Sequence, residues 1–163
     1  MPPDFADELV RLLPALRRYG LSLAGRPDLA DDLAQITVER ALSRAEGYDR
    51  AQPLRPWLFR ILRNAWIDMT RRQKVRGPTV DVTDAPEILP HDPGRALEAR
   101  LMLDAVRAAM ATLPVEQREV IHLVCVEDLS YAEAADALGI PRGTVMSRLS
   151  RGRAALAEKL GMI

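Results

Sequence analysis

The stretch Leu129–Leu160 constrains the fold of this chain more than any other part of the sequence. Ser130 is followed three residues later by Glu133, which is a capping box and marks the start of a helix. Apolar side chains then recur at helical spacing until Gly139, which supplies the left-handed residue that commonly ends a helix. Because Pro141 fits the first turn of a following helix, the stretch predicts two helices joined by a tight turn.

The second of these helices is predicted to be two-sided. Val145, Leu149 and Gly152 fall on one side of it. This is the layout of a helix-turn-helix, whose second helix lies in the DNA major groove, where arginine pairs with guanine and serine or threonine contacts bases or phosphates. An ordinary helical hairpin with a solvated basic side is the alternative, but the cap, the glycine and the placement of the arginines favour DNA binding. The polar side carries Thr144, Ser147, Arg148 and Arg151.

The rest of the sequence is also helical in pattern, with no sign of strands. Apolar residues at helical spacing predict helices over roughly 5–24, 29–44, 56–73, 95–111 and 114–125. Residues 76–94 lack a period and are rich in proline and acidic residues, so they are interpreted as a linker. The predicted fold is therefore all-α, with a small helical domain at 1–75, the linker at 76–94, and a second small helical domain at 95–163 that contains the helix-turn-helix.

Charge is distributed unevenly although the formal net charge of the 163-residue chain is zero. Residues 55–76 carry seven cationic side chains against one carboxylate, and residues 141–160 carry five against one. Acidic side chains gather instead near residue 30 and in the linker. Two basic blocks predict two contacts with a polyanion, while the acidic blocks suggest a protein partner or contacts within the chain.

Other classes of protein find little support in the sequence. There are no paired catalytic carboxylates, no glycine-rich phosphate loop and no nucleophile with an evident base, so an enzyme is not expected. His91 and His122 lack metal-ligand spacing, and no metal or cofactor is expected. No apolar run approaches the length that crosses a bilayer, so we expect no membrane insertion and a cytoplasmic protein. Cys125 lies in an apolar stretch and is expected to be a buried free thiol.

Three segments together resemble the bacterial extracytoplasmic-function sigma factors. LADDLAQITVERAL resembles the helix of their first domain that docks on RNA polymerase. PWLFRILRNAWIDMTRRQ resembles their segment for melting and reading the −10 promoter element. The C-terminal motifs LPVEQREV, LSYAEAA and GIPRGTVMSRLSRGR, with their spacing, resemble the domain that reads the −35 element. The resemblance covers nearly the whole chain.

The resemblance implies roles for particular residues. It implies that the clamp of the polymerase largest subunit is contacted by Asp31, Asp32 and Gln35, although carboxylates in a first helical turn also have a sufficient structural role. At the −10 element, it implies a loop that receives a flipped base, formed by Gly47, Tyr48 and Asp49, and strand or phosphate contacts by Asn64, Arg71 and Arg72. In the −35 major groove, it implies contacts by Arg142, Thr144, Ser147, Arg148 and Arg151.

The leading hypothesis is thus a stress-responsive sigma factor that binds core RNA polymerase, directs promoter recognition and melting, and is held by an anti-sigma factor. The runner-up is a sigma-like decoy that sequesters an anti-sigma factor without binding promoters, but such a decoy would not need the DNA-reading cations. A helix-turn-helix repressor with a ligand-sensing first domain is a third possibility. It would not explain the second basic helix at residues 56–73.

Overall fold

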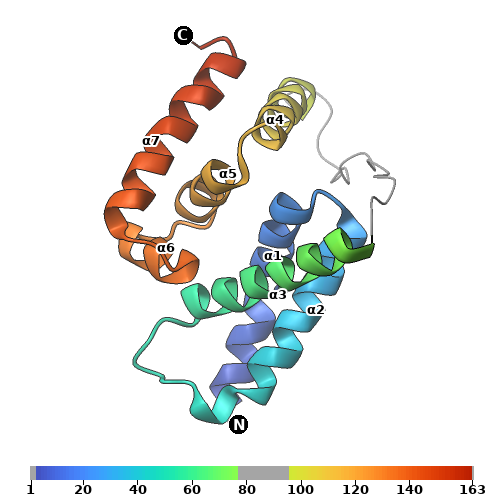
Figure 1. Ribbon diagram of the computed structural model, residues 1–163, viewed down its shortest axis with the longest axis vertical. Helices are drawn as coiled ribbons and strands as arrows, with labels where there is room; N and C mark the ends of the chain where they lie inside the picture. Colours follow the sequence, from blue (N-terminus) through green and yellow to red (C-terminus); the bar gives the residue numbers. More distant parts are fainter. Residues whose placement is uncertain (1–2, 77–95, 163) are drawn as a thin grey trace.

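The computed structural model describes residues 3–76 and 96–162, and all regular structure within them is helical (Figure 1). This confirms the all-α fold class. The predicted linker lies outside the described residues except for Arg76, which ends α3. The N-terminal half contains α1 (Pro3–Ala24), α2 (Pro27–Ser43), the 3₁₀ turn η1 (Ala45–Gly47) and α3 (Leu54–Arg76). The C-terminal half contains α4 (Ala96–Ala111), α5 (Val115–Ile121), the π-helical turn η2 (His122–Val126), α6 (Tyr131–Leu138) and α7 (Arg142–Lys159).

Helices α1, α2 and α3 pack on one another and form the N-terminal half. Pro14 lies inside α1, and the helix continues beyond it to Ala24. α1 and α2 approach each other closely at Gly20, where an added Cβ would lie 3.3 Å from the Cα and carbonyl oxygen of Ala30. The missing side chain therefore lets the two backbones meet.

The C-terminal half is built around the contact of α7 with α5. Val145 and Leu149 of α7 are fully or almost fully buried, as the sequence predicts. Gly152 is buried too. A Cβ at this position would lie 2.8 Å from the Cδ1 atom of Ile121 on α5, so the glycine allows the two helices to pack closely. After Ile121 the chain widens into the π turn η2, which leads to the capping residue Ser130 of α6.

The two halves share one buried core, whereas the sequence predicts a separate small core for each half. Tyr19 of α1 is completely buried between the halves. Its ring lies edge-on to Phe59 of α3, with centroids 5.4 Å apart, and stacks on His122 of η2 at 5.6 Å. The reason is that α6 packs on α3 while α5 and η2 pack on α1. Apolar residues that each half alone would leave exposed are thereby buried.

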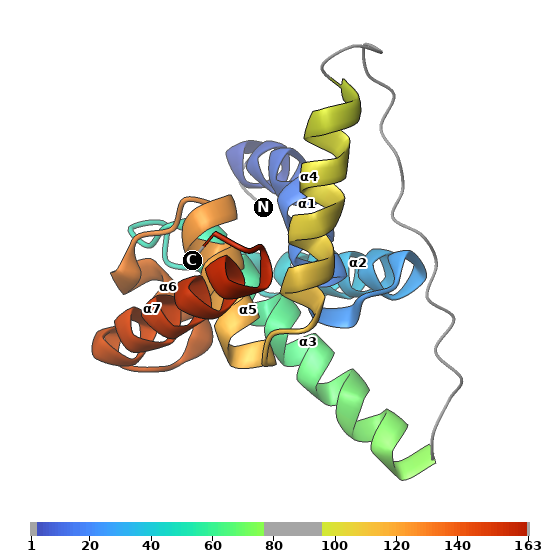
Figure 2. The ribbon, with the colours of Figure 1, turned by 90° about the horizontal axis from the view of Figure 1, so that it is seen from above.

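Two helical ends extend beyond this shared core. Figure 2 shows the last turns of α3 and the first turns of α4 projecting away from the other helices. Leu97, Leu101 and Met102 of α4 are each more than half exposed. Among the helices of the described residues, none combines the length and the apolar character needed to cross a bilayer.

Candidate nucleic-acid interface

The turn between α6 and α7 has the geometry that its sequence predicts. The Ser130 hydroxyl accepts a hydrogen bond from the Glu133 amide at 3.1 Å, and the Glu133 carboxylate accepts one from the Ser130 amide at 3.2 Å. Gly139 follows α6 in the left-handed conformation, with φ of 66°. Pro141 is the residue that precedes the first turn of α7. The capping box thus fixes where α6 begins, and the left-handed glycine ends α6 and turns the chain towards α7.

The outer side of α7 presents most of the residues predicted to read the −35 element. Arg142, Ser147 and Arg151 are exposed, whereas Thr144 and Arg148 are half-buried. The Ser147 hydroxyl donates to the Thr144 carbonyl at 3.1 Å, so one of its hydrogen bonds lies within the helix. Thr144, Ser147, Arg148 and Arg151 therefore form one flank of α7, whereas Arg142 is the first residue of the helix and lies towards its other edge.

One further exposed residue of α7 was missed by the sequence reasoning. Met146 is half exposed, although an apolar side chain on a helix of the core would be buried. An exposed apolar side chain beside Ser147 can contact the methyl group of thymine in a major groove. Its position beside Ser147 and one turn after Arg142 was the available signal.

The opposite edge of α7 carries a different contact. Arg153 lies with its Nη2 atom 3.6 Å from the Sγ atom of Cys125. Cys125 is exposed, so the expectation of a buried thiol was wrong. The π turn accounts for the difference, because it rotates Cys125 outward while His122 and Leu123 remain buried.

The residues predicted at the −10 element lie along α3 and in the loop before it. Asn64, Arg71 and Arg72 are exposed, with the two arginines on the projecting end of α3. They are separated from Asn64 by about 10 Å along the helix axis. This spacing suits successive contacts along one strand or its phosphates.

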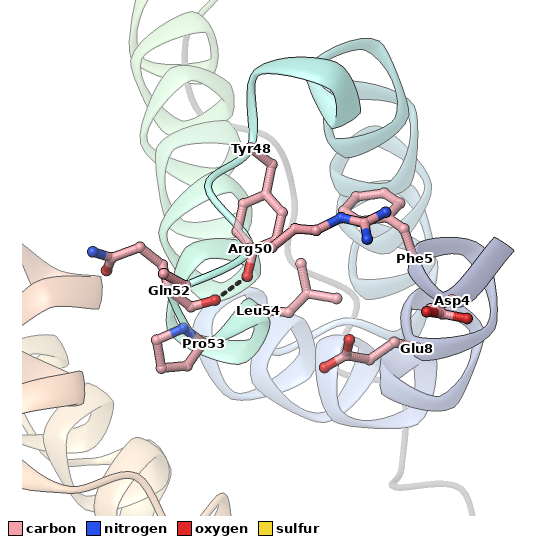
Figure 3. Close-up of a pocket in the computed structure, with 9 residues that line it drawn as sticks. Asp4, Phe5, Glu8, Tyr48, Arg50, Gln52, Pro53 and Leu54 are labelled. Atoms are coloured by element: carbon pink, nitrogen blue, oxygen red, sulfur yellow. Dashed lines mark hydrogen bonds between the residues drawn. The ribbon is translucent and has the colours of Figure 1, made fainter. Parts of the chain in front are cut away.

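The loop before α3 borders a cavity of about 450 Å³ (Figure 3). Tyr48 lines it, and its ring packs against Trp57 and Phe5 at centroid distances of 4.6 and 5.8 Å. The Tyr48 hydroxyl donates to the Gln52 carbonyl, which closes the loop. Burial raises the pKa of Tyr48, and the nearby carboxylates of Glu8 and Asp49 raise it further. The cavity is lined by Asp4, Phe5 and Glu8 of α1 and by Tyr48, Arg50, Ala51, Gln52, Pro53 and Leu54.

Only Tyr48 of the predicted loop trio lines this cavity. Asp49 instead accepts a hydrogen bond from the Ala51 amide at 3.0 Å, which stabilises the turn. Gly47 ends the 3₁₀ turn and has no atom near the place where a Cβ would stand. The structure therefore adds α1 to the candidate base pocket, and the sequence reasoning did not include that helix.

The residues predicted to contact polymerase share one exposed face of α2. Asp31, Asp32 and Gln35 are all exposed. Asp31 also pairs with Arg17 of α1 at 2.8 Å, and the Gln35 amide donates to Glu39 at 3.3 Å. The face is thus acidic and open, although part of its charge is already balanced within the chain.

Buried carboxylates between the halves were not predicted at all. Glu127 receives two hydrogen bonds from Arg18, at 2.9 and 3.0 Å, and lies 3.2 Å from His122 and 3.3 Å from Arg55. Burial acts to raise the pKa of the Glu127 carboxyl, but His122 and Arg18 outweigh it and lower the pKa to about 2. The carboxylate is therefore held in its charged form.

A second buried carboxylate, Glu119, lies on α5. It accepts hydrogen bonds from Arg63 at 2.8 Å and from the Tyr19 hydroxyl at 3.2 Å. Burial and the Glu119 charge raise the pKa of Tyr19 well above its ordinary value, so Tyr19 donates as a neutral phenol. In the described part of the chain, no three potential metal-ligating side chains come together.

Comparisons with known proteins agree with this arrangement. Residues 9–76 match the family model described as Sigma-70 region 2, and residues 103–156 match Sigma-70, region 4. The ECF RNA polymerase sigma factor EcfG of Rhodopseudomonas palustris is 36% identical over 154 residues, which cover 94% of this chain and 83% of that protein. SigL of Mycobacterium tuberculosis, also an ECF sigma factor, is 38% identical over 138 residues, which cover 82% of this chain and 76% of that protein.

Two solved structures are similar over nearly the whole chain. The sigma factor RpoE of Bartonella quintana, in complex with the anti-sigma factor NepR, has a TM-score of 0.82 and 34% identity and covers 98% of both chains. CnrH, in complex with the cytosolic domain of CnrY, has a TM-score of 0.70 and 28% identity over 97% of this chain and 88% of that chain. The matches to both sigma-70 regions, and to relatives across most of their length, show that this chain belongs to the extracytoplasmic-function (ECF) RNA polymerase sigma factors.

Proposed function

We propose that this chain binds core RNA polymerase and directs it to promoters by reading two DNA elements and melting one of them. The observation that carries the proposal is the two-sided helix α7, whose apolar side is buried on α5 while its polar flank is open. Family membership supplies the polymerase as the partner. The mechanism is binding alone, so the chain would act as a specificity subunit and would not catalyse a reaction itself.

The −35 element would be read by Thr144, Ser147, Arg148 and Arg151 on the outer flank of α7, together with Arg142 at the start of the helix. Arg151 is the residue best placed to pair with a guanine, since its side chain is exposed and, unlike that of Ser147, forms no hydrogen bond within α7. Met146 is also exposed, one turn after Arg142, and would add an apolar contact. These contacts would supply the sequence specificity of duplex binding.

The −10 element would be opened by α3 and its preceding loop. Asn64, Arg71 and Arg72 would follow the exposed strand, and the cavity beside Tyr48 would receive one base turned out of the duplex. A flipped base gains stacking on aromatic side chains, and the Phe5–Tyr48–Trp57 cluster offers them. Gly47 and Asp49 would shape this loop without touching the base.

The acidic face of α2 would dock on the clamp of the polymerase largest subunit through Asp31, Asp32 and Gln35. We assign residues 1–75 to polymerase and −10 binding, 76–94 to the linker, and 95–163 to −35 binding. The two matched family regions, at 9–76 and 103–156, support this division. The protein would act in the cytoplasm, where the polymerase and its promoters are.

An anti-sigma factor is the second partner that we propose. In two structures similar to this chain, the sigma factor RpoE is bound to the anti-sigma factor NepR, and CnrH is bound to the cytosolic domain of CnrY. Restraint by such a protein fits a sigma factor that is released under stress.

The direct test is transcription in vitro with purified core polymerase and genomic DNA, followed by sequencing of the 5′ ends of the transcripts. We expect initiation from one class of sites that share two upstream elements. The control is core polymerase alone, and Asp32→Ala should reduce initiation while leaving the fold intact. A decoy or a repressor would give no new start sites, and that result would contradict the proposal.

A further inference from the structure

We propose that the cavity beside Tyr48 selects guanine, through the carboxylates of Asp4 and Glu8 on α1 and the guanidinium of Arg50 in the loop before α3. The proposal rests on the proposed function, because it names the base that this cavity would take from the opened −10 element. It assigns part of the base specificity to α1, a helix to which the sequence reasoning gave no role in DNA binding.

The cavity has the size and the walls of a site for a planar ring. Its volume of about 450 Å³ lies within the range that is typical of small-ligand pockets. Phe5 and Tyr48 line it, with ring centroids 5.8 Å apart and ring planes inclined by 54°. Tyr48 packs in turn on Trp57 at 4.6 Å, which holds the Tyr48 ring in place. A base that enters the cavity can therefore stack on a fixed aromatic ring.

Three charged side chains surround this aromatic wall. Asp4 and Glu8 lie one turn apart on α1, so they share one side of the helix. Figure 3 shows the Arg50 side chain extending from the loop toward α1. All three side chains are exposed, and within the described residues no hydrogen bond or ion pair occupies them. Their charges are therefore available to a ligand in the cavity.

Glu8 is the carboxylate that the fold alone explains least. A carboxylate in the first turn of a helix, such as Asp4, complements the helix dipole whether or not it binds a ligand. Glu8 lies beyond that turn. Burial raises the pKa of Tyr48 and the charge of Glu8 raises it further, so the Glu8 carboxylate is close to the ring on which a base would stack.

The balance of charge favours a base over a phosphate as the group that enters the cavity. Two carboxylates against one guanidinium leave the rim with a net negative charge, which repels a phosphate. A neutral base is not repelled, and its polar edge can form hydrogen bonds with the charged groups. The backbone of the strand would then stay outside the cavity while one base enters it.

Guanine matches these groups better than the other three bases do. Its Watson–Crick edge carries two adjacent donors, N1–H and the N2 amino group, which the two oxygens of one carboxylate can accept together. Its O6 atom lies beside them and can accept from a guanidinium. Adenine and cytosine place a ring-nitrogen acceptor beside a single amino group, and thymine has one N–H between two carbonyl oxygens. Each of these three bases would therefore set an acceptor against the carboxylate.

The test is transcription in vitro from genomic DNA by core polymerase with the full chain, with the 5′ ends sequenced to align the −10 elements. We expect guanine at one −10 position of the non-template strand at most start sites. With Glu8→Ala, the preference for guanine at that position should fall by roughly 10-fold or more, while the other positions keep their preferences. The matched control Asp7→Ala removes an exposed carboxylate of α1 that does not line the cavity, and it should change no preference.

Replacing that guanine by inosine, which lacks only the N2 amino group, connects the preference to Glu8. On one such promoter, inosine should reduce open-complex formation by roughly 10-fold for the wild type, because a hydrogen bond to a charged acceptor is lost. The same replacement should cost Glu8→Ala less than about 3-fold, since the acceptor is already absent. Circular dichroism of both variants checks that the helices are retained.

The proposal is overturned if no −10 position prefers guanine, if Glu8→Ala keeps the guanine preference, or if inosine costs both proteins equally. Each of these results would leave the proposed function intact, because start sites with two upstream elements would still be found. If the wild type gave no start sites, the proposed function would fail, and the choice of base would fail with it.

Discussion

Arg151 and Arg153 lie two residues apart on α7 and have different surroundings. Arg151 is exposed on the flank proposed to face DNA, whereas Arg153 lies against the Cys125 thiol on another side. Substitutions of the two arginines therefore distinguish the loss of a specific DNA contact from a general loss of positive charge.

Arg151→Ala should weaken binding to a duplex with the −35 element by about 10-fold or more and reduce the salt dependence by about one released counterion. Arg153→Ala removes the same charge and should change the affinity less than 3-fold, by an order-of-magnitude argument from screened, non-contacting charges. Titrations at several salt concentrations measure both. Equal losses in the two variants would remove the assignment of this flank to DNA.

Glu127 predicts a pH dependence of stability. Burial acts to raise the pKa of its carboxyl, but His122 and Arg18 outweigh burial and lower the pKa to about 2 in the folded protein, against an ordinary 4.5. Since the folded pKa is the lower one, the stabilisation is complete above pH 4.5 and is lost as the pH falls towards 2. The full effect is on the order of 3 kcal/mol.

The free energy of unfolding of the wild type and of Glu127→Gln, measured between pH 6 and pH 2, tests this dependence. The glutamine cannot ionise, so the advantage of the wild type should shrink steadily below about pH 4.5. A difference that stays constant across the range would show that the Glu127 charge contributes nothing.

The two buried carboxylates that sequence reasoning missed were missed for the same reason. Glu119 and Glu127 are surrounded by charges that come from α1 and α3, about a hundred and about seventy positions earlier in the chain. No local pattern marks a carboxylate as buried when its partners are so distant. Cys125 was placed in the core because its neighbours are apolar, and the π turn that turns it outward has no clear signature in sequence.

At the scale of single elements, the helix-turn-helix was the most predictable part. Its capping box, left-handed glycine and buried side are all local features, and the structure has each of them. The helices of the N-terminal half were also predicted, although α3 extends further in both directions than its apolar period indicates. The cavity beside Tyr48 was only half predicted, since α1 reaches it through tertiary packing.

The capping box predicts a stability change that is confined to α6. Ser130→Ala should lower the free energy of unfolding by about 1 kcal/mol, because the Glu133 amide loses its acceptor. The midpoint of thermal unfolding should fall by about 2–4 °C. Glu133→Gln keeps the reciprocal bond and should melt close to the wild type. A Ser130→Ala protein that melts with the wild type would mean that the cap does not stabilise this helix.

The close contact of α1 with α2 gives a second prediction for an element. Gly20→Val should destabilise the chain by about 1–3 kcal/mol, because the new side chain would press on the backbone of Ala30. Gly143 on α7 has nothing near its Cβ position, so Gly143→Val should change stability by less than about 0.7 kcal/mol. Chemical denaturation compares the two. Equal effects would mean that the helices can separate at Gly20 without cost.

At the scale of the whole molecule, the contact between the halves could not be predicted from sequence. The acidic and basic blocks indicated that the chain can bind itself, but which carboxylate meets which arginine depends on how α6 docks on α3 and η2 on α1. The same docking produces the shared core around Tyr19 and Phe59.

The central claim is that the chain binds core polymerase and reads two promoter elements, which requires the two halves that pack together in the structure to separate. The distance between spin labels at Glu46→Cys and Ala132→Cys, in a Cys125→Ser background, measures this directly. Both label sites are exposed, one before α3 and one on α6.

We predict one short distance in the free protein, and an increase of tens of ångströms when core polymerase and promoter DNA are added, because the two elements are about 85 Å apart. Co-elution with the polymerase confirms that the labelled chain is bound. An unchanged short distance in the bound protein, or no association with polymerase at all, would contradict the account.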